Sequence, residues 1–277
     1  MKKTIIRESD LTQLFLYNRS LPCADTVARL EEIEHAWIIP LVGSVEADTP
    51  ALTSRAQWVR ALDDLLGRER AGSAAGEYLA EKSSREEFRA VVSEFALDGL
   101  TEAQNLFPAV ARLPIRAQMP LMRVLIDEFG CGNLQQAHSQ LYRNLLTELG
   151  LPLDLNAYLN RASDETYAFL NVFYWLTQRA PHVEYFLGAL AYLEASIPTA
   201  FTYHARACER LRIANNQYYT EHVHIDSFHM QEMQVAIREY EAACGLDPTR
   251  VWIGARLLSE LIGTAFDAAV ERAREVA

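Results

Sequence analysis

The segment EHVHIDSFHM, residues 221–230, concentrates three histidines and one aspartate within eight positions. In a helix that turns about 100° per residue, His222, Asp226 and His229 fall within an arc of about 60° on one face, while His224 points to the opposite side. Met233, four residues after His229, continues the same face, so we expect the three side chains to point into the protein interior. Two neutral imidazoles and a carboxylate suit iron, manganese or zinc. The alternative is a set of solvated polar residues or hydrogen-bonded core histidines.

Further ligands must come from other helices, because three side chains on one helix do not complete a metal site. His138 lies on an apolar helical stripe, and Glu128 precedes it by ten residues. The two are about 80° apart on a straight helix, a gap that the glycines between them could close. Glu194 ends another apolar stripe, and Pro198 leaves its carbonyl without the usual amide partner.

Each of these three residues has an ordinary structural alternative when it is taken singly. Glu128 could be an exposed carboxylate at a helix end, His138 could be a core histidine, and Glu194 could lie on a solvent-exposed helix face. Together with the first trio they supply three carboxylates and three histidines on three helices. Two irons or manganese ions bridged by carboxylates inside a helical bundle need such a set. A mixed oxygen and nitrogen set suits redox iron better than a structural zinc.

The elements that must position these residues are helices, and we predict an all-α fold. Almost every segment has a helical period, and no alternating run is bounded by hairpin signals. A stretch rich in glycine, serine and alanine, residues 67–78, resembles a linker. It predicts one domain over residues 1–277, with an N-terminal helical extension, 1–78, and a metal-binding core bundle, 79–277. The expected helices cover residues 11–16, 27–37, 55–68, 84–98, 101–113, 117–129, 133–149, 164–178, 182–197, 199–212, 214–244 and 248–275.

Composition and charge narrow the classes of partner. Half of the 277 residues are hydrophobic, which is ample for a large core, and the net charge of −11 argues against nucleic acid. The four cysteines are widely separated and form no C-x-x-C pair, which favours a reducing cytoplasm over a disulfide framework. No apolar run is long enough to span a bilayer, and the N-terminus has no secretory pattern. We therefore expect a cytoplasmic protein without membrane or nucleic-acid partners.

The pattern D-E-x-G-x7-H at Asp127, Glu128, Gly130 and His138, followed by LEASIP and the trio on residues 222–229, resembles the haem-oxygenase-like diiron oxidase and oxygenase family. The resemblance covers roughly residues 80–277. It implies a seven-helix core in which two non-haem irons per chain replace haem, cycle between Fe(II) and Fe(III), and use O2 as co-substrate. The implied metal-binding and catalytic residues are Glu128, His138, Glu194, His222, Asp226 and His229.

Some N-oxygenating members of that family carry an extra carboxylate, which Glu102 resembles. Glu102 falls on the apolar face of Phe88 and Phe95 if the helix continues through Gly99. The alternative is that Thr101 caps a new helix, whose positive N-terminus Glu102 favours.

Other residues are candidates for supporting the ligands, because each ligating imidazole needs an acceptor for its other N–H. Asp127 stands beside a ligand, and Tyr218 and Tyr219 lie one turn before His222. The tyrosines have core packing as their alternative. A second aromatic cluster is expected to pack in the bundle core, and the alternative is that one of its rings borders the substrate cavity. The cluster consists of Phe169, Phe173, Tyr174 and Trp175.

The family resemblance implies oxidation of a small metabolite but leaves N-oxygenation, C–C cleavage and oxidative decarboxylation open. Our first expectation is an O2-dependent enzyme of natural-product biosynthesis that acts on an amino-acid-derived amine or amide. A polar, charge-bearing pocket would favour this substrate, and a long apolar tunnel would favour a fatty acid. The alternative outside enzymes is an iron-binding or interaction protein. The sequence leaves open whether an external electron donor is a partner. For the N-terminal extension it indicates no role other than packing or a homodimer contact.

Overall fold

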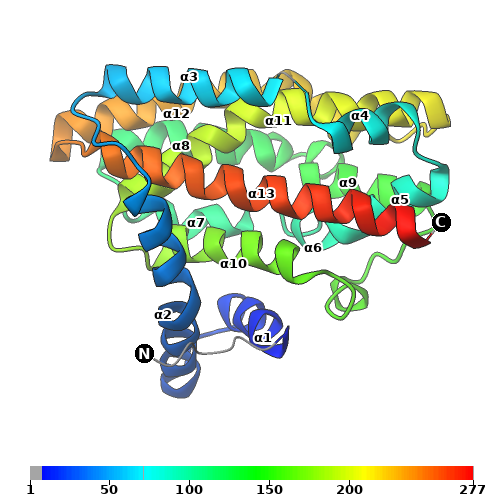
Figure 1. Ribbon diagram of the computed structural model, residues 1–277, viewed down its shortest axis with the longest axis horizontal. Helices are drawn as coiled ribbons and strands as arrows, with labels where there is room; N and C mark the ends of the chain where they lie inside the picture. Colours follow the sequence, from blue (N-terminus) through cyan, green and yellow to red (C-terminus); the bar gives the residue numbers. More distant parts are fainter. Residues whose placement is uncertain (1–7, 71, 277) are drawn as a thin grey trace.

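The computed structural model describes residues 8–70 and 72–276. These residues form helices joined by loops and turns, and they include no β-strand (Figure 1). The expected all-α class is confirmed, while the first seven residues of the predicted extension lie outside the described part. The α-helices are α1 Glu8–Asn18, α2 Ala24–Ala47, α3 Arg55–Arg70, α4 Ala74–Glu81, α5 Arg85–Glu94, α6 Ala96–Gly99, α7 Phe107–Val110, α8 Ile115–Glu128, α9 His138–Glu148, α10 Asp164–Gln178, α11 Val183–Leu211, α12 Gln217–Cys244 and α13 Pro248–Val276. Short 3₁₀ helices are η1 Gln104–Leu106, η2 Gly130–Gly132, η3 Leu134–Gln136 and η4 Leu155–Ala157.

Serine side chains mark where several of these helices begin. The hydroxyl of Ser84 accepts the amide of Glu87, whose carboxylate in turn accepts the amide of Ser84, so α5 starts with a capping box. Ser73 and Ser163 accept amides in the first turns of α4 and α10. Each cap satisfies a backbone N–H that has no partner within its helix, which fixes these starts locally.

The centre of the bundle is α11, which packs against both α12 and α13 (Figure 1). Two glycines allow α11 and α13 to cross closely. A Cβ added to Gly188 would lie 1.7 Å from the carbonyl oxygen of Val251, and one added to Gly254 would lie 1.9 Å from that of Tyr185. The two backbones therefore touch where no side chain fits, and α11 is held with its Glu194 face toward α12.

The N-terminal helices α1 and α2 extend beyond the bundle, and α1 lies beside α10 (Figure 1). Asn171 on α10 donates to the carbonyl of Leu11, and Arg179 at the end of α10 binds both Asn18 and the buried carboxylate of Glu34. Helices α3 and α4 pack on α11 and α13, along the bundle itself. The division at residue 78 stays a prediction.

Several expected element boundaries differ from the structure. The helix predicted at 27–37 continues through Pro40 to Ala47 as α2, and the one predicted at 84–98 is divided into α5 and α6. The helices predicted at 182–197 and 199–212 form one continuous α11, because packing on both sides holds the helix together through Pro198. The helix predicted at 101–113 is instead a turn, η1 and the short α7, since Ala103 adopts a positive φ of 63° that no helix accommodates. The predicted linker 67–78 contains the end of α3 and the start of α4.

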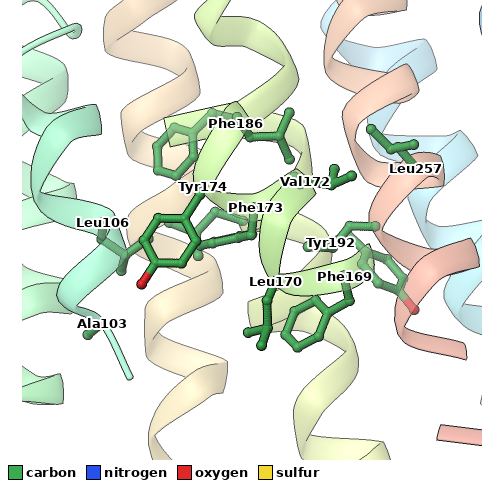
Figure 2. Close-up of a cluster of buried hydrophobic side chains, with 14 of the residues drawn as sticks. Ala103, Leu106, Phe169, Leu170, Val172, Phe173, Tyr174, Phe186, Tyr192 and Leu257 are labelled. Carbon is green, nitrogen blue, oxygen red and sulfur yellow. The ribbon is translucent and has the colours of Figure 1, made fainter. Parts of the chain in front are cut away.

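The aromatic cluster of α10 lies in the core, as the apolar pattern predicts. Phe169, Phe173, Tyr174 and Trp175 are all buried. Figure 2 shows the first three of them among the buried side chains that surround α10. Phe169 also borders a cavity described below. Among the described residues, no helix combines the length and the apolar character needed to cross a membrane.

Candidate metal centre

Four side chains could hold one metal ion and are called the first ligand group, because one atom from each lies within 4.8 Å of every other: Glu102, Glu128, His138 and His222. Nδ1 of His138 is 3.0 Å from both Oε2 of Glu128 and Nε2 of His222. Nε2 of His222 is also 3.1 Å from Oε1 of Glu102. Atoms that occupy neighbouring positions around an ion at about 2.1 Å are about 3 Å apart. The spacing of the group is that of ligands sharing one cation.

A second ligand group adjoins the first and shares Glu128 with it. Ligand atoms of Glu128, Asp226 and His229 lie within 4.8 Å of one another. Nδ1 of His229 is 3.5 Å from Oε1 of Glu128 and 3.4 Å from Oδ1 of Asp226. Glu194 extends this group, with its Oε2 at 3.2 Å from the same nitrogen. Glu128 thus turns one carboxylate oxygen to each group. The structure brings all six residues expected from the sequence, and Glu102, into one cluster.

Each of these side chains reaches the cluster from a defined place in the fold. Glu128 is the last residue of α8 and His138 is the first of α9. The intervening chain reverses through Gly130, whose φ is +62°, and a Cβ there would lie 2.5 Å from the amide nitrogen of Ala137. The glycines therefore close the angular gap between Glu128 and His138 as expected, by ending one helix and starting another.

Helix α12 supplies three members of the cluster from one face. His222, Asp226 and His229 are at most 2% exposed, whereas His224 is exposed on the other side. Glu194 projects from α11 and is 5% exposed. The predicted helical phase of the trio is confirmed.

Glu102 reaches the first group by a route that neither sequence interpretation described. Helix α6 ends at Gly99, and the hydroxyl of Thr101 donates to the carbonyl of Leu97 and caps no helix. Glu102 lies in the turn that follows, where Oε1 accepts a hydrogen bond of 3.0 Å from the hydroxyl of Tyr218. Its side chain is 17% exposed. A turn places Glu102 beside His222, so both helical interpretations of its position are wrong.

A backbone hydrogen bond fixes which nitrogen of His222 faces the group. Nδ1 is 2.7 Å from the carbonyl oxygen of Tyr218, and because a carbonyl only accepts, Nδ1 carries the proton. In the neutral ring, Nε2 then presents its lone pair to the ligand group. Tyr218 therefore orients His222 through its backbone and Glu102 through its hydroxyl, which makes it the supporting residue that the sequence proposed.

The other two supporting candidates differ from Tyr218. Oδ2 of Asp127 lies 3.5 Å from Nε2 of His229, and that nitrogen makes no hydrogen bond among the described residues. Tyr219 packs on the ring of His204, with ring centroids 4.7 Å apart, and its hydroxyl bonds to none of the seven clustered side chains. Tyr219 is a core residue, the alternative that the sequence left open.

The cluster carries an excess of negative charge. Glu102, Glu128, Glu194 and Asp226 have no lysine or arginine partner among the described residues, only the histidines. Burial raises the pKa of Glu194 to about 7, and the charges of Asp226 and Glu128 add to this effect against the hydrogen bond from His229. Burial likewise raises the pKa of Asp226. Carboxylates buried in this way are stable only when protons or metal cations balance them.

The histidines respond to the same charge in the opposite direction. Burial lowers the pKa of His229, but hydrogen bonds and charge from Asp226, Glu194 and Glu128 outweigh it and raise the pKa to about 11. Burial also lowers the pKa of His222, yet Glu102 and the neighbouring carboxylates raise it well above its usual value. The cluster holds protons strongly, and bound divalent cations would displace them.

Several buried polar atoms of the cluster have no hydrogen-bond partner in the described residues: Oε2 of Glu102, both carboxylate oxygens of Asp226 and Nε2 of His229. Buried polar atoms are nearly always satisfied, so these point to a missing ligand. A set of carboxylate oxygens and imidazole nitrogens matches iron or manganese. The residues present therefore fit a pair of such ions.

A cavity of about 730 Å³ lies beside the first ligand group. Tyr218 and Tyr142 line it, and the hydroxyl of Tyr218 touches Glu102. Asp98 on α6 also lines the cavity, a residue that the sequence reasoning missed. A usable signal was present, because Asp98 falls seven residues after the buried Val91 and so interrupts an apolar helical face with a carboxylate.

The sequence profile of a family described as iron-containing redox enzymes matches residues 89–263, more than half of the chain. The chain belongs to the iron-containing redox enzyme family. All seven clustered side chains lie within the matched range, so the metal that the family name specifies fits the cluster found in the structure. The resemblance stated from the ligand pattern is thereby confirmed, and iron is the metal that these ligands support.

The chain is also similar to a curated enzyme in sequence and to a solved structure in fold. A nitrosourea synthase from Streptomyces achromogenes subsp. streptozoticus is 32% identical over 141 residues, which are 49% of this chain and 29% of that enzyme. The chain thus matches less than a third of that relative's length. A crystal structure of a domain of unknown function from Shewanella denitrificans OS217 superposes with a TM-score of 0.57 at 13% identity, covering 81% of this chain and 94% of that one. That domain has a haem-oxygenase-like fold, which confirms the expected architecture.

Proposed function

We propose that this iron-containing redox enzyme is a non-haem diiron oxygenase that uses O2 to oxidise a small metabolite. The observation that carries the proposal is the position of Glu128. Its Oε2 lies 3.0 Å from His138 in the first ligand group, and its Oε1 lies 3.5 Å from His229 in the second. A carboxylate shared in this way supports two adjacent cations held by one bridging ligand.

The first ion would be held by Glu102, Glu128, His138 and His222, and the second by Glu128, Glu194, Asp226 and His229. The reduction of O2 and the oxidation of substrate are the chemistry that two irons supply when they are bound. The protein positions the ligands, excludes water by burying them, and balances charge with four carboxylates and three histidines. Tyr218 keeps Glu102 and the lone pair of His222 directed at the first position.

We further propose that the oxidised atom is a nitrogen of an amino-acid-derived substrate. The nitrosourea synthase supports this proposal, because a nitrosourea contains an N–N=O group whose formation requires oxidation of nitrogen. The matched region includes only part of that enzyme, so its whole activity is not transferred. The geometry beside the first group adds support, since a carboxylate on Asp98 suits a basic nitrogen compound better than a fatty acid.

Metal analysis of protein loaded anaerobically with Fe(II), together with Mössbauer spectroscopy, tests the diiron proposal. We expect about two irons per chain with magnetic coupling after exposure to O2. His222→Ala, Asp226→Ala and His229→Ala should each lower iron content, whereas His224→Ala is the matched control on the exposed face of α12. A stoichiometric zinc site that excludes iron would refute the proposal.

Oxygen consumption separates an enzyme from an iron-binding protein without turnover. The diferrous protein should consume O2 faster when its amine substrate is added, which a panel of amino acids and their amine derivatives would reveal. Iron-loaded protein that stays diferrous in air with every candidate would assign the cluster to iron binding alone.

A further inference from the structure

We infer that the cavity beside the first ligand group is the substrate site and that the carboxylate of Asp98 pairs there with a cationic nitrogen group of the substrate. The inference rests on the proposed function, which places oxidation at the adjoining metal cluster. It goes further by assigning two roles to Asp98: the side chain positions the substrate, and its negative charge selects a cationic one.

Asp98 connects the cavity with the cluster. It lies on α6, directly before the turn that carries Glu102. Two other lining residues contact the cluster directly: the hydroxyl of Tyr218 bonds to Glu102 at 3.0 Å, and the ring centroid of Phe201 lies 5.1 Å from that of His222. A substrate group paired with Asp98 would therefore be held beside the first ligand group.

The carboxylate of Asp98 has no hydrogen bond or ion pair from the described residues. Glu69, which lines the same cavity, accepts hydrogen bonds of 3.0 Å from Tyr192 and 2.7 Å from Ser259. Burial, followed by the charge of Glu102, raises the pKa of Asp98 to about 8. A bound cation would counter both effects and stabilise the ionised carboxylate.

The charged residues that line the cavity also favour a cation. Four are acidic, Glu69, Asp98, Asp267 and Glu271, and two are basic, Arg70 and Arg274. Both arginines are exposed, as are Asp267 and Glu271, which leaves Glu69 and Asp98 as the half-buried charged residues of the lining. The guanidinium of Arg274 lies over the ring of Tyr78 at 4.5 Å from its centroid. Burial lowers the pKa of the lining His204 to about 4, so this imidazole contributes no positive charge at neutral pH. Asp98 has no ion pair with either arginine, so an anionic group placed beside it would be repelled.

Aromatic side chains complete a surface suited to an organic cation. Phe95, Tyr142, Phe169, Phe201, Tyr218 and Tyr219 line the cavity together with Asp98. Ring faces attract ammonium and guanidinium groups, and the attraction strengthens where water is excluded. A carboxylate beside such rings recognises an alkylammonium or a guanidinium, and a fatty acid gains nothing from it. Most of the remaining lining is apolar, so the preference for a nitrogen cation rests on the unpaired carboxylate of Asp98 and on the aromatic rings.

Binding of three small probes with the same chain length tests the inference: hexylamine, hexanol and hexanoate. Calorimetric titrations would use Fe(II)-loaded protein under nitrogen at about pH 8.5, where hexylamine is protonated and Asp98, with its pKa of about 8, is mostly ionised. We expect hexylamine to bind about tenfold or more tightly than hexanol, with hexanoate the weakest, because only the ammonium group forms a charge-assisted hydrogen bond with Asp98. Hexanoate that binds as tightly as hexylamine would overturn the inference, and this comparison requires no variant.

Two substitutions test whether Asp98 causes the preference for hexylamine over hexanol. Asp98→Asn should abolish the advantage of hexylamine over hexanol, whereas Asp63→Asn, at an exposed aspartate of α3 outside the cavity, should preserve it. Unchanged hexylamine affinity in Asp98→Asn would contradict the assignment.

Iron content measured on the same samples separates the two proposals. Samples that retain two irons but show no amine preference would overturn this inference and leave the diiron proposal standing. An amine preference in a protein that takes up no iron would overturn the diiron proposal instead.

Discussion

The hydroxyl of Tyr218 donates a 3.0 Å hydrogen bond to Oε1 of Glu102, the same oxygen that faces Nε2 of His222. One side chain of α12 therefore fixes a carboxylate that comes from a turn over a hundred residues earlier in the chain. The backbone carbonyl of Tyr218 also binds His222, so the two ligands share a single support.

Tyr218→Phe should weaken iron binding in the first group while the fold is retained. The change removes the hydrogen bond to Glu102 and keeps the ring, and loss of such a supporting partner lowers metal affinity by about 10- to 100-fold. Equilibrium titration with Fe(II) under nitrogen measures this effect. Tyr219→Phe is the control, since its hydroxyl contacts no clustered ligand, and equal losses from both substitutions would show that aromatic packing matters instead.

Glu102→Gln should reduce iron content from about two to about one per chain. The amide keeps the size of the side chain and can still accept from Tyr218, but it loses the charge that the first ion requires. The second ligand group, which does not include Glu102, should keep its iron. Iron analysis and Mössbauer spectra report the stoichiometry, with Glu86→Gln on the exposed face of α5 as the control. Two tightly held irons in Glu102→Gln would limit Glu102 to a structural role.

His204 should make stability fall in mild acid. Burial lowers its pKa from 6.5 to about 4, so between these values the unfolded chain binds a proton that the folded chain does not. The contribution of neutral His204 to the free energy of unfolding is present above pH 6.5 and is lost as pH falls toward 4. The free energy of unfolding then changes by at most about 1.4 kcal/mol per pH unit. Urea unfolding of wild type and His204→Gln from pH 7 to pH 4 measures the difference in slope. Parallel curves would show that the imidazole does not titrate as expected.

Gly188→Ala should destabilise the fold by about 1–3 kcal/mol, because the new methyl group would collide with the backbone of α13 at Val251. The matched control is Gly67→Ala in α3, where a Cβ would meet nothing within 4 Å. That substitution should be neutral or stabilise by up to about 1 kcal/mol, since alanine favours a helix over glycine. Thermal unfolding compares the two, and equal melting temperatures would indicate that α11 and α13 can separate without cost.

Much of the fold and most of the ligand set could be predicted from the sequence because they depend on local periodicity. A helix of 3.6 residues per turn places His222, Asp226 and His229 on one face and His224 on the other, whatever surrounds it. The positive φ of Gly130 is likewise a local property of glycine, and it brings Glu128 to His138. The order of the ligand residues along the chain carried the family resemblance, which the family match then confirmed.

Contacts between distant elements were decided only by the tertiary structure. Pro198 does not end α11, since packing against α12 and α13 maintains the helix where local propensity predicts a break. The turn after α6 directs Glu102 to His222, a position that no helical phase could give. The cavity around Asp98 is lined by residues of α6, α11, α12 and α13, which are far apart in the sequence, so the unpaired carboxylate can be recognised only from the tertiary structure. Sequence periodicity determines which face a residue occupies, but the partner across that face depends on how the helices pack.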